Sequence, residues 1–133
     1  MIGTVAGHLT AIGYGWPLAA LAAHYHDTYG QALANIHASL ECGVAVYDSS
    51  IAGLGGCPYA PGASGNISSE DAIHMLEAMG CDTGVDMARL LEAARALPAI
   101  VGHEVPGQVA RAGPTSQLHP APAAVAELRA AFS

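Results

Sequence analysis

The spacing of apolar residues predicts strands and helices in alternation along the first half of the chain. Residues 18–26 are mostly apolar and end in the polar sequence His-Tyr-His-Asp, which favours a buried strand. Residues 31–41 place apolar side chains near helical spacing, and Gly43 follows as the expected C-terminal cap. Residues 44–49 are again short and apolar, which predicts a second strand before a loop rich in glycine and proline.

Two further helices are expected in the second half. Ser68 stands three residues before Asp71, a spacing typical of a capping box, and predicts the start of a helix that runs to residue 79. Residues 86–97 form another candidate helix, which the proline that follows is expected to end. Beyond it, several prolines interrupt the pattern, and only residues 125–132 suggest a terminal helix.

The order strand, helix, strand, long loop, helix, helix predicts an α/β fold. Strands joined by a helical crossover are expected to be parallel. The polar residues cluster where the strands end, and in parallel α/β folds that edge carries the chemistry. A candidate site is therefore expected at the C-terminal strand ends.

Composition and charge limit the kinds of partner that this chain is expected to bind. The chain has 133 residues and a net charge of −7, with four arginines and no lysine, so nucleic acid is not an expected partner. No apolar run approaches the ~20 residues of a membrane helix, so no membrane partner is expected. The start lacks the basic residues of an export signal. The three cysteines are therefore interpreted as reduced thiols of a cytoplasmic protein.

A pair of histidines is the first candidate for metal chemistry. On a strand, His24 and His26 point to one side and can bind one divalent cation. Imidazole suits several transition ions, whereas the amide oxygen of Asn66 would move the preference toward Mg²⁺ or Mn²⁺. Asp27 is available as a hydrogen-bond partner of such ligands. The alternative is an ordinary surface pair or a satisfied pair in the core.

Cys57 is the second candidate, because it lies inside the glycine-rich loop of residues 53–66. A thiol near a cation has a lowered pKa and can donate or accept a proton at a bound substrate. The alternative is a structural thiol packed under the loop.

Three stretches in order along the chain resemble the hydroxymethylglutaryl-CoA lyase family. Residues 24–35, HYHDTYGQALAN, look like the motif of that family's sixth strand. Residues 48–59, DSSIAGLGGCPY, resemble the signature around its catalytic cysteine. The match continues through Gly65-Asn66, Ser69-Glu70-Asp71 and Thr83-Gly84-Val85, and it runs from about residue 18 to residue 94.

The resemblance implies a partial TIM (β/α)8 barrel, roughly the last three βα units plus C-terminal helices. Residues 1–97 would form the barrel portion, and residues 98–133 a helical or irregular extension. It implies His24, His26 and Asn66 as metal ligands, with Mg²⁺ or Mn²⁺ as the cation, and Cys57 as the catalytic thiol. Glu70 falls where the family has an acidic residue near the site. The implied reaction cleaves a C–C bond of the acyl-CoA substrate 3-hydroxy-3-methylglutaryl-CoA, giving acetoacetate and acetyl-CoA.

The family's first strand supplies an arginine and a metal-binding aspartate that have no counterpart in this sequence. We therefore expect the C-terminal part of a lyase that is inactive alone and forms a homo-oligomer or associates with the missing barrel half. One alternative is a sister lyase for a larger 3-hydroxyacyl-CoA. Another is a non-catalytic truncated product or assembly subunit.

Overall fold

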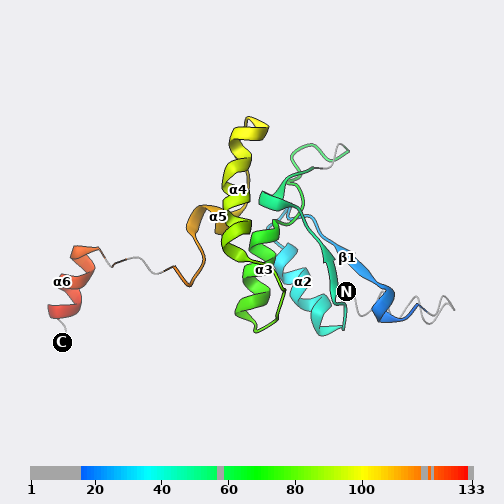
Figure 1. Cartoon of the computed structure of the whole chain (residues 1–133), viewed down its shortest axis with the longest axis horizontal. Coiled ribbons are helices and arrows are strands. Elements are labelled where there is room, and N and C mark those ends of the chain that lie inside the picture. Colours follow the sequence, from blue (N-terminus) through cyan, green and yellow to red (C-terminus); the bar gives the residue numbers. More distant parts are fainter. Residues whose placement is uncertain (1–15, 57–58, 118–119, 121, 132–133) are drawn as a thin grey trace.

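A small parallel sheet with helices packed beside it forms the body of the molecule (Figure 1). The computed structural model describes residues 16–56, 59–117, 120 and 122–131. Its strands are β1 (Ala22–His24) and β2 (Val46–Asp48), and 3-10 turns form η1 (Leu18–Ala20) and η2 (Ile51–Gly53). Its helices are α2 (Ala32–Glu41), α3 (Ser69–Ala78), α4 (Met87–Val101), α5 (Gln108–Ala112) and α6 (Ala123–Ala131).

Strands β1 and β2 pair in parallel, and helix α2 connects them as a crossover. This confirms the expected α/β arrangement. The register places Ala22 opposite Val46 and His24 opposite Asp48. Both strands therefore end at the same edge of the sheet, each with a polar residue. The sheet therefore has the polar edge at which the sequence predicted a site.

The first strand is shorter and more exposed than predicted. Residues 18–20 form the turn η1 instead of a strand, and the prediction of a buried strand was wrong because Ala22 and His24 are exposed. Among the described residues, β1 pairs with β2 alone, so its outer edge has no neighbouring strand to cover it. An exposed apolar strand of this kind is typical of a surface that packs against another segment.

Local hydrogen bonds explain where the first two long helices begin. The Asp27 Oδ1 atom accepts the Ala32 amide at 2.9 Å and so occupies the start of α2. The Ser68 Oγ atom accepts the Asp71 amide at 3.1 Å, which confirms the predicted cap of α3. Gly43 follows α2 with a φ of +90°, as expected for a glycine just past a helix end.

The prediction that α4 ends before Pro98 was wrong, since the helix continues to Val101. A proline inside a helix removes one backbone hydrogen bond. Here Leu97 and Val101, on either side of it, pack against a buried cluster that includes Ala52 and Ala110 from other segments, and this contact offsets the loss. Gly102, at a φ of +78°, then ends the helix.

Two helices follow α4 in the chain, and they differ in their contacts with the other helices. Helix α5, which the sequence pattern did not predict, packs against α3 and α4 and contributes Ala110 to the buried cluster. Helix α6 overlaps the predicted terminal helix and lies apart from the other helices (Figure 1). Within the described segments, no helix combines the length and the apolar character needed to cross a bilayer.

Candidate metal and loop site

The three residues expected to bind a cation lie together at the polar edge of the sheet. The ring centroids of His24 and His26 are 5.1 Å apart, with the rings edge to face. His26 forms an isolated antiparallel bridge with Asn66, so the chain after the glycine-rich loop returns beside the end of β1. The Ile67 amide, which donates to the Tyr25 carbonyl at 3.0 Å, fixes this approach. The arrangement therefore gathers two imidazoles and one carboxamide.

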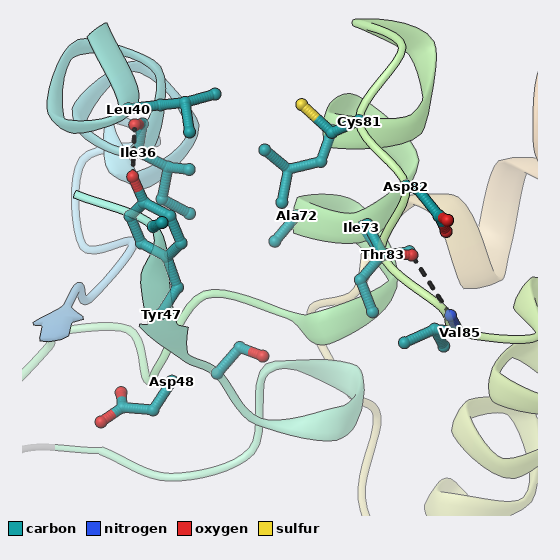
Figure 2. Close-up of a pocket in the computed structure, with 13 residues that line it drawn as sticks. Ile36, Leu40, Tyr47, Asp48, Ala72, Ile73, Cys81, Asp82, Thr83 and Val85 are labelled. Carbon is teal, nitrogen blue, oxygen red and sulfur yellow. Dashed lines mark hydrogen bonds between the residues drawn. The ribbon is translucent and has the colours of Figure 1, made fainter. Parts of the chain in front are cut away.

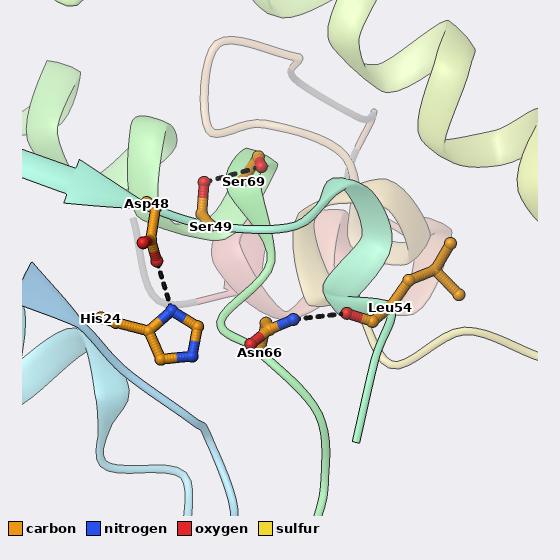
Figure 3. Close-up of polar contacts among 6 residues, drawn as sticks. All are labelled: His24, Asp48, Ser49, Leu54, Asn66 and Ser69. Atoms are coloured by element: carbon orange, nitrogen blue, oxygen red, sulfur yellow. Dashed lines mark hydrogen bonds and ion pairs between the residues drawn. The ribbon is translucent and has the colours of Figure 1, made fainter. Parts of the chain in front are cut away.

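Asp48 orients His24. The Nδ1 atom of His24 contacts the Oδ1 atom of Asp48, its partner in the sheet register (Figure 3). Histidines that bind metals commonly donate their other ring N–H to a carboxylate, which fixes the tautomer and the ring orientation. With Nδ1 engaged in this way, Nε2 is the nitrogen left for a cation. The sequence had suggested Asp27 for this role, but its carboxylate caps α2.

The side chain of Asn66 is held by the glycine-rich loop. Its Nδ2 atom donates to the Leu54 carbonyl at 2.9 Å, and Figure 3 shows this bond on the side away from His24. The bond sets the amide orientation and leaves Oδ1, the harder donor atom, at the opposite end of the group. A carboxamide oxygen beside two imidazoles is a donor set that fits a divalent cation.

Glycines let the two sides of the loop approach each other. A Cβ atom at Gly65 would lie 1.8 Å from the Gly55 carbonyl oxygen, and a Cβ atom at Gly55 would lie 2.6 Å from Asn66 Nδ2. Gly55 also has a φ of +106°, which favours glycine. Any side chain at Gly65 would therefore push the strand-like chain that carries Asn66 away from the loop.

Glu70 lies beneath this loop. Its side chain is fully buried, and Oε2 accepts the Ala52 amide at 2.9 Å, while Oε1 has no hydrogen-bond partner among the described residues. Burial raises the pKa of Glu70, and the nearby Asp71 adds to this, whereas hydrogen bonds from the Ala52 and Glu70 amides oppose it. Ala52 has a φ of +59°, a strained conformation for a residue with a side chain, and this bond helps to hold it.

Cys57, the predicted catalytic thiol, lies outside the described residues, so its role stays a prediction. The described part of the chain contains no cluster of three or more histidine, cysteine, aspartate or glutamate residues suited to a metal ion. The candidate donor set is thus two histidines and an asparagine, and it carries no negative charge of its own.

A cavity of about 440 Å³ opens beside β2. Figure 2 shows Ile36, Leu40 and Tyr47 on one wall, and Cys81, Thr83 and Val85 on the other. Val85, which lines the cavity, is 40% exposed, and Val46 of β2, which does not line it, is 53% exposed. The cavity and β2 therefore both present apolar surface that the described residues do not cover.

Comparisons with known proteins agree on one family. The HMGL-like family model matches residues 1–97. Human mitochondrial hydroxymethylglutaryl-CoA lyase is 54% identical over 104 residues, covering 78% of this chain and 32% of the human protein. A Pseudomonas aeruginosa protein named 3-hydroxy-3-isohexenylglutaryl-CoA/hydroxy-methylglutaryl-CoA lyase is 54% identical over 96 residues, covering 72% of this chain and 32% of that protein.

Solved structures show the same likeness. An HMG-CoA lyase from Acinetobacter baumannii, in complex with coenzyme A and 3-methylmalate, superposes with a TM-score of 0.81 at 40% identity. The match covers 91% of this chain and 39% of that one. The Pseudomonas aeruginosa hydroxymethylglutaryl-CoA lyase superposes with a TM-score of 0.73 at 49% identity, covering 83% of this chain and 37% of that one. The chain spans about a third of the length of the curated relatives it matches.

Proposed function

The chain belongs to the HMGL-like family, and from this membership we propose that it carries the C-terminal part of a lyase site for 3-hydroxy-3-methylglutaryl-CoA. The observation that carries the proposal is the convergence of His24, His26 and Asn66 at the polar edge of the sheet. Residues far apart in the sequence meet there in the pattern that the family resemblance implies. The relatives at 54% identity are named as lyases for this substrate.

In this proposal His24, His26 and Asn66 hold a divalent cation, Mg²⁺ or Mn²⁺. The donor set fits, because Asp48 orients His24 and the Leu54 carbonyl orients the amide of Asn66. When bound, such a cation supplies Lewis-acid stabilisation of the substrate's hydroxyl and carboxylate oxygens.

The proposed chemistry leaves one step to this chain's own side chains. A base removes the proton of the substrate's hydroxyl, the C–C bond breaks to give acetoacetate, and the electron pair remains on acetyl-CoA as an enolate. We assign Cys57 to return a proton to the enolate carbon, because it lies in the loop that also positions Asn66.

The chain is proposed to form roughly the last three βα units of the barrel at residues 1–97, followed by the extension at residues 98–133. Its partner is then the remaining part of the barrel, on a separate or a continuous polypeptide. The exposed Val46 and the cavity beside β2 support this, because a closed barrel would cover both. Without that partner we expect no lyase activity.

Cation binding tests the proposal without relying on turnover. Three neutral donors bind Mn²⁺ poorly, so adding a polypeptide that covers the first two thirds of the Pseudomonas aeruginosa relative, and with it a metal-binding aspartate, should tighten Mn²⁺ binding by at least roughly 100-fold, more than the loss of a hydrogen-bond partner of a metal ligand typically costs. Titration with Mn²⁺, followed by electron paramagnetic resonance, measures this.

Two histidine variants control the titration. The His24→Ala variant should lose the tightening, whereas His37→Ala, at an exposed position on α2, should keep it. Unchanged affinity on mixing would contradict the proposal and favour a non-catalytic product.

A second substrate class has one specific observation in its favour. The printed name of the Pseudomonas aeruginosa relative includes 3-hydroxy-3-isohexenylglutaryl-CoA, which carries a longer branch than the methyl compound. A sister lyase for such a larger 3-hydroxyacyl-CoA would use the same cation ligands and the same thiol. Rates of the reconstituted protein with both substrates distinguish the two functions.

A further inference from the structure

The segment from Val105 to Val109 packs directly beneath the base of the glycine-rich loop. A Cβ atom at Gly107 would lie 2.1 Å from Glu70 Oε1 and 3.4 Å from the Ala52 Cα atom. From the other side, a Cβ atom at Gly53 would lie 2.9 Å from a ring carbon of Pro106. Glycines on both sides therefore permit a contact that no larger residue would allow. This segment lies beyond the residues that the family model matches.

Two neighbouring carboxylates on the first turn of α3 bind the loop and the C-terminal segment at once. Glu70 Oε2 accepts the Ala52 amide at 2.9 Å. Asp71 accepts the Gln108 amide at 3.0 Å and the Val109 amide at 2.7 Å, and so holds the start of α5. Both side chains are buried, where a hydrogen bond is costly to lose.

The base of the loop also orients the side chain of Asn66, a candidate cation ligand. Within η2 the Gly53 amide donates to the Ser50 carbonyl at 3.0 Å, and the Leu54 amide donates to the Ile51 carbonyl at 3.3 Å. The Leu54 carbonyl then accepts Asn66 Nδ2 at 2.9 Å. A displacement of η2 would therefore remove the acceptor that orients the amide of Asn66.

We propose that Glu70, with the segment from Val105 to Val109 packed against it, is a positioning element for Asn66, acting through the turn η2. The inference rests on the proposed function, in which Asn66 is a cation ligand. It assigns Glu70 a place under the loop, away from the reacting atoms. It also gives the C-terminal extension a function at the site, since α5 and the residues before it hold the turn from below.

Amide exchange of the full chain, followed by nuclear magnetic resonance, tests the proposal and needs neither a cation nor turnover. In Glu70→Ala the Ala52 amide and the side-chain amide of Asn66 should both exchange about tenfold faster, the change expected when one buried hydrogen bond is lost. Glu70→Gln keeps a side-chain oxygen for the Ala52 amide and should stay close to the original rates. The amide of Ala94 in α4 should not change.

Two other variants complete the design. Glu77→Ala removes an exposed carboxylate from the same helix and should alter neither rate. Arg95→Ala removes the bond from Arg95 Nε to the Ala110 carbonyl, 3.0 Å long, and loosens α5 from α4. It should raise the exchange rates of the Ala52 amide and the Asn66 side-chain amide by about threefold. This variant therefore still tests the proposal if Glu70→Ala does not fold.

Two results would overturn the inference. If the Ala52 amide exchanges faster while the Asn66 side chain does not, the turn does not position the ligand. If the Ala94 amide accelerates together with both, Glu70 supports the fold in general and has no specific effect on the loop. If the variants change amide exchange as expected but the reconstituted protein does not bind Mn²⁺, the result contradicts the proposed function. It does not contradict the positioning of Asn66.

Discussion

Replacing Cys57 with alanine in the reconstituted lyase is expected to lower turnover by about 10²- to 10⁴-fold, the contribution typical of a positioned proton donor. The substitution removes the thiol proton that we assign to the enolate of acetyl-CoA. It leaves His24, His26 and Asn66 in place, so the affinity for Mn²⁺ should stay nearly unchanged. Steady-state release of acetoacetate and a Mn²⁺ titration measure the two effects separately.

Cys81 provides the control for this variant. It lines the cavity beside β2 and is partly exposed, away from the proposed donor set. Cys81→Ala should therefore keep its turnover, provided that the reconstituted complex still forms. Retained turnover in Cys57→Ala would remove the thiol from the mechanism, and a parallel loss of Mn²⁺ affinity would show that the residue acts on the donor set.

Replacing Gly65 with alanine is expected to destabilise the chain by about 3 kcal/mol or more, the upper range for overpacking at a close contact. The added Cβ atom would meet the Gly55 carbonyl oxygen at 1.8 Å and the Gly53 carbonyl oxygen at 2.7 Å. Both are backbone atoms and cannot rotate away, so the loop and the chain that carries Asn66 must separate. Chemical unfolding followed by circular dichroism measures the change.

Gly56 is the matched control, because it lies in the same loop and, among the described residues other than its chain neighbours, no atom lies within 4 Å of a Cβ atom built there. Gly56→Ala should change the free energy of unfolding by less than about 1 kcal/mol. Equal destabilisation by the two variants would contradict the close packing of Gly65 against Gly55.

Local signals predicted much of the fold. The capping sequence at Ser68 and the glycine after α2 are short-range features, so the sequence alone located those helix ends. The continuation of α4 through Pro98 was not predicted, since it depends on the contacts of Leu97 and Val101 with a cluster that other segments complete. Helix α5 was missed for a similar reason, because the carboxylate that holds its first amide lies 37 residues earlier in the chain.

At the site, too, the local sequence predicted some residues, whereas contacts between distant parts of the chain were not predictable. Alternation along a strand placed His24 and His26 on one side, and the family resemblance added Asn66. The partner of His24 was not foreseeable, because Asp27 and Asp48 both lie near strand ends and only the sheet register brings Asp48 beside the ring. Asp27 lies five residues before Ala32, outside the usual capping position, so its bond to the Ala32 amide was not foreseeable either.

Glu70 illustrates how a resemblance can name a residue without giving its place. The motif pointed to an acidic residue near the site, and the structure buries its carboxyl group under η2, bonded to the Ala52 amide. No pattern in the local sequence predicts that contact, since it joins α3 to a turn 18 residues earlier.

The release of acetoacetate from 3-hydroxy-3-methylglutaryl-CoA in the presence of Mg²⁺ is the measurement that decides whether this chain holds part of a lyase site. We expect no release by the chain alone, and release once the polypeptide covering the first two thirds of the barrel is added. Release by the pure chain alone would contradict the claim that this chain holds only part of the site, and no release from a complex that binds Mn²⁺ tightly would contradict the assignment of the reaction.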